Sequence, residues 1–273
     1  MKELPKDDLI KYLAEKRYIS DRRASVRHFI DKYINKQDVA MALDLTLHFY
    51  SVGDLLPADL IKIENFLLQM RNPGACFRFV MNVPTNKLSE HEEIVLQANN
   101  PHYSKKMATL KGANAEKHSQ VILASKDAKI SCEFLNKLPF VDKQEHINVI
   151  ANGCEPYYML LAAKKYCGVG CKKLENAILN LKDAYYSTQY AKQIAGADIM
   201  AHQTVVMFFG DAAQILEFAK EVESADMHFM ITKLHEKFNR LYKTGKIDEA
   251  KEYKKLLESL MQIKERREDK EKT

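Results

Sequence analysis

Four of the nine histidines occupy one position of a recurring segment, where their imidazoles could hold a metal ion, a phosphate or an acidic partner. They are His91, His118, His146 and His202, and Leu174 takes the same position between the last two. Neighbouring helices of a stack lie about 8–10 Å apart, too far for adjacent imidazoles to share one ion through bonds of about 2 Å. An apolar Leu174 in the same column favours a packing role for this position. We therefore predict packing histidines and no metal site, with one ring nitrogen free to bond the preceding loop at Asn114, Asp142 or Asp198.

Tyrosines gather at a second recurring position, the start of the second helix expected in each segment. They are Tyr103, Tyr157, Tyr158, Tyr185 and Tyr186. Such a row could stack nucleic-acid bases or peptide side chains, or could pack between helices with its hydroxyls in solvent. Successive helical residues are about 100° apart, so one tyrosine of each adjacent pair should face outward. We predict that these tyrosines belong to a partner-binding surface centred on residues 143–198.

Lysines form a third column, near the expected end of the same helices. Lys164, Lys192 and Lys220 share it, and Asn136 stands there one segment earlier. The column could be a basic ridge for a phosphate backbone or an acidic protein. Solvated lysines favoured by the dipole at helix C-termini explain it equally well. We include the three lysines in the predicted partner-binding surface.

The five cysteines give no paired spacing of a disulfide framework or a zinc site. An odd number in mostly apolar surroundings indicates reduced, buried thiols. Cys154 and Cys167 are expected at opposite ends of one helix, about 20 Å apart, and cannot share an ion. We predict no metal and no cofactor.

Catalytic motifs are also missing from the sequence. It contains no glycine-rich phosphate loop, no His-Glu-x-x-His and no nucleophile elbow. We predict that the chain is not an enzyme. A solenoid enzyme acting on nucleic acid is a weaker alternative, since residues 115–226 hold 12 basic against 14 acidic side chains.

The elements that must position these residues follow from a period of 28 residues. Cutting at Ala115, Lys143, Cys171 and Ile199 gives four consecutive segments of equal length that agree column by column. In each, two apolar stripes at helical spacing flank an N-cap residue such as Asp183. Less regular copies precede them. A period of this length is the signature of a solenoid. We predict an all-α fold, a right-handed α-solenoid of about seven helical hairpins with helical caps.

This pattern also divides the chain into three parts. Residues 1–59 should form an N-terminal helical cap, at residues 5–17, and a first divergent hairpin; residues 60–226 the helical-hairpin array; and residues 227–273 a C-terminal helical cap. The connector at 51–59 is irregular. The last ten residues, KERREDKEKT, contain no apolar side chain, so we expect them to be frayed or disordered.

Composition limits the function further. The 273 residues carry a net charge of +5, and this modest excess lies outside the central segments, unlike the basic stripe of a nucleic-acid binder. No apolar run approaches the about 18 residues that span a bilayer, and the start lacks a secretory apolar segment. We expect a cytoplasmic, intracellular protein.

The segments resemble a known kind of repeat. The phrases KKLENAIL, KDAYYSTQYAK and AGAD within residues 172–198 are similar to short helical-hairpin repeats in uncharacterised proteins of bacteriophage genomes, over roughly residues 60–226. The resemblance implies no established activity; it suggests a phage accessory or anti-defence protein acting in the host cytoplasm. We predict a scaffold or inhibitor that binds a protein partner. The alternative is a helical-repeat protein that binds nucleic acid.

Overall fold

The computed structural model describes residues 5–16, 18–138, 141–166 and 171–271, and in this part of the chain the regular elements are all α-helices. The predicted all-α class is confirmed. Helices adjacent in sequence pack in pairs, in a repeat-like arrangement. The chain separates into two compact units, residues 1–125 and 126–273. This division falls inside the predicted array of residues 60–226, and the three predicted parts remain predictions.

Unit 1, residues 1–125, is built as two layers of helices. Each helix of the first layer packs against the next one in that layer: α2 on α4, α4 on α6, and α6 on α8. In the second layer α3 packs on α5. The bounds are α1 Lys6–Ala14, α2 Ile19–Asn35, α3 Val39–Ser51, α4 Pro57–Met70, α5 Pro73–Val80, α6 Leu88–Gln97, α7 Pro101–Met107 and α8 Ala115–Ser125.

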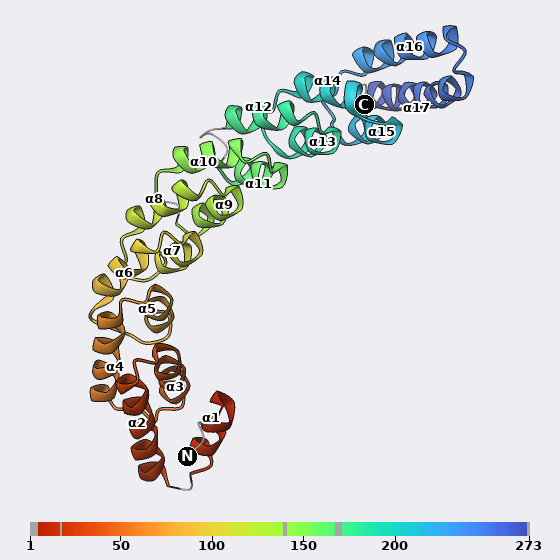
Figure 1. Cartoon of the computed structure of the whole chain (residues 1–273). Helices are drawn as coiled ribbons and strands as arrows, with labels where there is room; N and C mark the ends of the chain where they lie inside the picture. Colours follow the sequence, from red (N-terminus) through yellow and green to blue (C-terminus); the bar gives the residue numbers. More distant parts are fainter. Residues whose placement is uncertain (1–4, 17, 139–140, 167–170, 272–273) are drawn as a thin grey trace. The chain divides into compact units, whose positions relative to one another are not determined.

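Unit 2, residues 126–273, repeats the arrangement (Figure 1). Helices α10, α12, α14 and α16 follow one another in the first layer, and α9, α11, α13 and α15 in the second, with α17 packed on α15 and α16. The bounds are α9 Ala128–Lys137, α10 Lys143–Asn152, α11 Pro156–Tyr166, α12 Cys171–Leu181, α13 Ala184–Gln193, α14 Ile199–Phe209, α15 Ala212–Glu221, α16 Met227–Lys243 and α17 Ile247–Glu271. The 28-residue pattern thus predicted the paired helices correctly.

Six of the turns between paired helices share one backbone conformation, whereas Gly210 in the α14–α15 turn has a φ of −80°. An exposed residue with positive φ ends the first helix, and a polar residue follows it and caps the second. The positive-φ residues are Gln37, Arg71, Asn99, Lys126, Cys154 and Lys182, with φ between 47° and 57°. Asp183 shows the cap: its Oδ1 accepts a hydrogen bond from the Tyr186 N–H at 3.0 Å. This confirms Asp183 as the N-cap that the sequence predicted.

Buried glutamates hold the first layer of unit 1 together. The Glu92 Oε1 accepts a hydrogen bond from the Asn114 N–H at 2.6 Å, just before α8 begins. The same oxygen lies 3.1 Å from Nε2 of the buried His118, although without hydrogen-bond geometry. One repeat earlier, Glu64 Oε1 lies 3.3 Å from Nε2 of His91. Each glutamate thereby connects one first-layer helix to the next, and we call these residues clamps.

Unit 2 has two clamps of different chemistry. Glu175 on α12 accepts a hydrogen bond from the Asp198 N–H at 2.5 Å and lies 3.5 Å from Nε2 of His202. One repeat later Gln203 stands in its place, and Met230 stands where His202 was. The Gln203 side chain accepts from the Asp226 N–H and donates to the Asp226 carbonyl, both at 2.8 Å.

The prediction that the histidines pack inside the fold is confirmed, because all four are fully buried. The hydrogen-bond partners predicted for His118 and His202, which were Asn114 and Asp198, were wrong. The rings of His91, His118 and His202 contact the clamp glutamates of the preceding repeat rather than the loop before their own helix. A glutamate side chain reaches across the stack, whereas the loop residues are occupied as helix caps; Asp198, for example, accepts from the Ala201 N–H at 3.1 Å.

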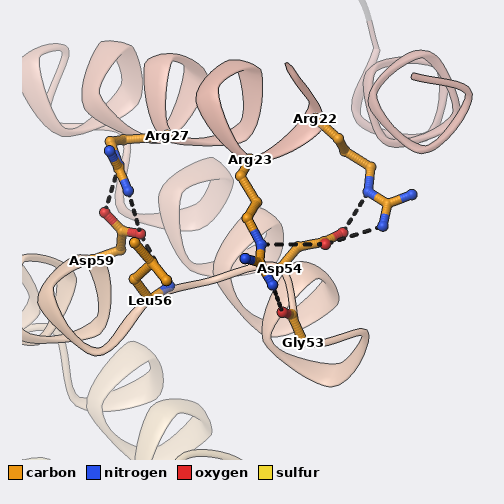
Figure 2. Close-up of polar contacts among 7 residues, drawn as sticks. All are labelled: Arg22, Arg23, Arg27, Gly53, Asp54, Leu56 and Asp59. Atoms are coloured by element: carbon orange, nitrogen blue, oxygen red, sulfur yellow. Dashed lines mark hydrogen bonds and ion pairs between the residues drawn. The ribbon is translucent and has the colours of Figure 1, made fainter. Parts of the chain in front are cut away.

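The N-terminal connector is tied down by arginines of α2 (Figure 2). The buried Asp54 carboxylate lies between Arg22, at 2.6 Å, and Arg23, at 3.9 Å. Arg23 also donates to the Gly53 carbonyl, and Arg27 donates to both carboxylate oxygens of Asp59, at 2.7 and 3.2 Å. The predicted irregular connector is therefore short and fixed by ion pairs, since α4 begins at Pro57.

The two ends of the chain differ in how well they were predicted. α1 lies within the predicted residues 5–17, as expected. The expectation of a frayed tail was wrong, because α17 continues to Glu271. Arg267 explains part of this: its guanidinium donates to the carbonyls of Ala219, Val222 and Glu223 at 2.5 to 2.9 Å, at the end of α15. In the part of the chain described, none of the helices has the length and apolar character needed to cross a membrane.

Candidate functional site

Two of the predicted tyrosines form the most regular exposed feature of unit 2. Tyr157 near the start of α11 is 57% exposed, and Tyr185, at the same position of α13, is 49% exposed. The two helices pack side by side in the second layer. Exposed aromatic side chains therefore recur on neighbouring helices, one repeat apart.

The adjacent tyrosines support the exposed ones. Tyr158 and Tyr186 are half-buried, and each meets its neighbour edge to face, with ring centroids 5.1 Å apart in both pairs. As predicted, one tyrosine of each pair faces outward. Tyr103 lies in unit 1, on α7, where it is half-buried and stacked on Phe77 with ring centroids 4.6 Å apart.

The predicted lysines lie on the outward faces of the same helices. Lys164 and Lys192 each follow an exposed tyrosine by seven residues, which is two helical turns, so tyrosine and lysine share a face. Lys164 is exposed; Lys192 forms an ion pair with Glu221 on α15. Lys220, on α15, is exposed. We call the surface formed by Tyr157, Lys164, Tyr185 and Lys192 the Tyr/Lys face.

This surface can recognise a partner by both apolar and polar contact. Each tyrosine offers a rigid ring with a hydrogen-bonding tip, and each lysine offers three donors about 10 Å along the helix. The Lys192–Glu221 pair halves the free positive charge of the face, since Glu221 neutralises one of the two cations. The chemistry thus suits a mixed protein surface better than a polyphosphate backbone.

The cysteine predictions were correct for two of the three thiols that the structure describes. Cys76 and Cys132 are buried, and burial raises the pKa of each thiol to about 11. Cys154 was predicted wrongly, because it is exposed in the turn before α11 rather than buried at the start of the helix. Cys167 and the Cys171 side chain lie outside the described residues.

The buried histidines are poor metal ligands or acid–base groups where they stand. Burial lowers the pKa of His91, His118 and His202, and it lowers the pKa of His146 to about 4 although nearby Asp142 acts in the opposite direction. The imidazoles are therefore neutral at pH 7. Among the residues that the structure places, no group of three or more His, Cys, Asp or Glu could hold a metal ion.

The sequence interpretation missed a second exposed region, at α14 and α16. Phe208 and Phe209 end α14 with 64% and 54% of their surface exposed, and cationic side chains of α16 lie beside Phe208. A signal was present: α14 carries no Asp, Glu, Lys or Arg, so apolar residues cover all its faces, including the one that meets solvent. The sequence interpretation also missed the clamps. Their signal was a glutamate directly after the histidine column, as at Glu92 and Glu175.

Comparisons with known proteins give no further identification: no family model, no curated protein and no solved structure matches this chain.

Proposed function

We propose that this chain is an α-solenoid of about seven helical hairpins with helical caps, and that it acts as a non-enzymatic scaffold or inhibitor that binds a protein partner. The observation that supports this most is the Tyr/Lys face of α11 and α13. Tyrosine is enriched at binding hot spots because it presents a large rigid surface at low entropic cost. Here two exposed tyrosines recur one repeat apart.

The resemblance of residues 172–198 to phage repeat proteins extends the proposal. We suggest a phage accessory or anti-defence protein that works inside the host cytoplasm by occupying a host protein. Its partner would contact the central hairpins, residues 143–198, first. Lys220 would add contacts at the margin of this surface, and Tyr103 in unit 1 remains a separate predicted contact.

The test compares exposed tyrosines with supporting ones. Tagged wild-type protein and two double variants, Tyr157→Ala/Tyr185→Ala and Tyr158→Ala/Tyr186→Ala, are used for affinity purification from native cells followed by mass spectrometry. We expect a specific protein to be enriched with the wild type and lost with the exposed-pair variant. If both variants retain the partner while their melting temperatures fall, the tyrosines serve packing and the contact surface lies elsewhere.

A mobility-shift experiment separates protein binding from nucleic-acid binding. Mixed RNA and DNA are added at two salt concentrations. Under the proposal no shift appears. Tight binding that weakens steeply with salt would instead indicate a nucleic-acid-binding protein, because releasing counterions from neutralised phosphates produces that dependence.

A further inference from the structure

A groove of about 420 Å³ between α14 and α16 of unit 2 combines apolar and cationic side chains. Its apolar side is Met207 and Phe208 of α14, and Phe208 is the most exposed large apolar side chain in the described part of the chain. A phenylalanine that is 64% exposed costs free energy in water unless another surface covers it. The second helix supplies the chemistry that identifies this surface.

α16 lines the groove with one face. Lys233, Glu236, Lys237 and Arg240 recur at the i, i+3, i+4, i+7 spacing and cover about 10 Å along the helix. Lys233 and Glu236 pair with each other at 2.8 Å. Lys237 lies over the Tyr253 ring, 4.6 Å from its centroid. Among the residues that the structure places, none forms an ion pair with the Arg240 guanidinium. The groove thus has a surplus of two positive charges beside an exposed phenylalanine.

We propose that this groove binds an acidic amphipathic helix of a partner protein. Apolar residues of the partner helix would cover Phe208, beside the largely buried Met207. Its carboxylates, spaced by one helical turn, would meet Lys237 and Arg240, the two cations that Glu236 does not neutralise. Helix-in-groove recognition uses such regularly spaced apolar anchors, and complementary charge selects the partner.

This inference does not depend on the Tyr/Lys face, because no residue is shared between the two surfaces. Helix α14 is also suited to the role, because without Asp, Glu, Lys or Arg it offers no charged group that a docking apolar face would have to desolvate. A nucleic-acid strand could also stack on Phe208 and place phosphates beside Lys237 and Arg240. The two occupants predict different outcomes in one experiment.

The experiment measures fluorescence anisotropy with the full-length protein and labelled model peptides of about 18 residues, long enough for five helical turns. One peptide carries leucine at i, i+3, i+4 and i+7 with glutamate elsewhere. The other replaces each glutamate by lysine, and oligo-dT is the third probe. We expect the acidic peptide to bind at least tenfold more tightly than the basic one, and oligo-dT not to compete.

Three variants locate the binding. Phe208→Ser should weaken the acidic peptide at least tenfold, and Lys237→Glu/Arg240→Glu should reverse the preference toward the basic peptide. Tyr157→Ala/Tyr185→Ala should change neither affinity. Circular dichroism checks that each variant is folded. The proposal is overturned if the acidic peptide does not bind, if Phe208→Ser and the charge reversal leave its affinity unchanged, or if oligo-dT displaces it.

Discussion

Two neighbouring contacts between first-layer helices of unit 2, which we call junctions, are held by different side chains. Between α12 and α14, Glu175 accepts the Asp198 N–H and lies beside the imidazole of His202. Between α14 and α16, Gln203 bonds both the N–H and the carbonyl of Asp226, and Met230 replaces the histidine. The backbone at the start of the following first-layer helix is held in both cases.

The difference shows why the histidines occur where they do. A buried carboxylate has lone pairs that one backbone N–H cannot satisfy, and a neutral imidazole alongside can supply a second polar neighbour. A carboxamide contains its own donor and acceptor, so an apolar methionine is sufficient beside it. In a third variant, the sequence has Ile147 at the clamp position and Leu174 in the histidine column. At these junctions the residue in the histidine column matches the clamp, and His146, which follows Ser119, is the exception.

Removing the carboxylate should break the α12–α14 junction. Glu175→Ala leaves the Asp198 N–H and the His202 ring without their partner, and we expect unfolding free energy to fall by about 3–4 kcal/mol. Urea unfolding followed by circular dichroism measures this. Lys172→Ala is the matched control, because Lys172 is an exposed partner of the same carboxylate. Equal midpoints for Glu175→Ala and wild type would contradict the clamp role.

The free energy of unfolding should depend on pH through His146, because no glutamate stands at the clamp position one repeat before it. The clamp position one repeat before His146 holds Ser119, and burial lowers the pKa of His146 from 6.5 to about 4 in the folded protein. The unfolded chain therefore binds this proton first as pH falls, so stability present above pH 6.5 is lost between pH 6.5 and about pH 4. The loss at His146 amounts to about 3 kcal/mol at pH 4.

Thermal melts of wild type and His146→Leu across this range check the effect. The variant should lose less stability than wild type between pH 7 and pH 4. The exposed His228→Leu is the matched control and should follow the wild-type curve. If wild type and His146→Leu lose stability in parallel, the buried imidazole does not control the acid sensitivity.

Copying one junction into the other should be nearly neutral. Glu175→Gln/His202→Met reproduces the Gln203/Met230 pair, and we expect stability within about 1 kcal/mol of wild type. His202→Met alone leaves a buried carboxylate with fewer polar neighbours and should cost about 1–2 kcal/mol. A double-mutant cycle measures the coupling. Additive single effects would show that the two positions are independent and would refute the comparison.

The Tyr/Lys face should contribute least to stability. Tyr157→Ala/Tyr185→Ala removes side chains about half exposed, and we expect a change within about 0.5 kcal/mol. Tyr190→Ala, at a side chain that is 1% exposed and stacked on His202, should cost about 3 kcal/mol or more. Comparable losses in both variants would mean that the exposed tyrosines are part of the core.

The helices were predictable because their signals are local. The apolar stripes and the cap at Asp183 lie within one 28-residue segment, and such spacing is sufficient to place two helices and the turn between them. The clamps depend instead on which side chain of one repeat reaches a backbone group of the next. Glu92 and Asn114 are 22 residues apart. Helical spacing alone does not show that such a glutamate is buried.

The candidate surfaces divide in the same way. The angle between adjacent helical residues predicted that one tyrosine of each pair faces outward, and the structure identifies these as Tyr157 and Tyr185. Exposure of Phe208 did not, since a helix with apolar residues on every side gives no preferred outward direction. The order of α17 beyond Lys264 was also unpredictable locally, because Arg267 bonds carbonyls 44 to 48 residues earlier in the chain.

The left-handed turn residues give the protein a set of labelling points spaced by whole repeats. Each turn needs a backbone conformation but not a particular side chain, as arginine, asparagine, lysine and cysteine all occupy it, and each of these side chains is exposed. Cys154 shows that a thiol is tolerated there. Single cysteines at positions 71 and 99 in unit 1, or 126, 154 and 182 in unit 2, would carry fluorophores one repeat apart. The distances between these labels would report how the helices of each unit separate during unfolding.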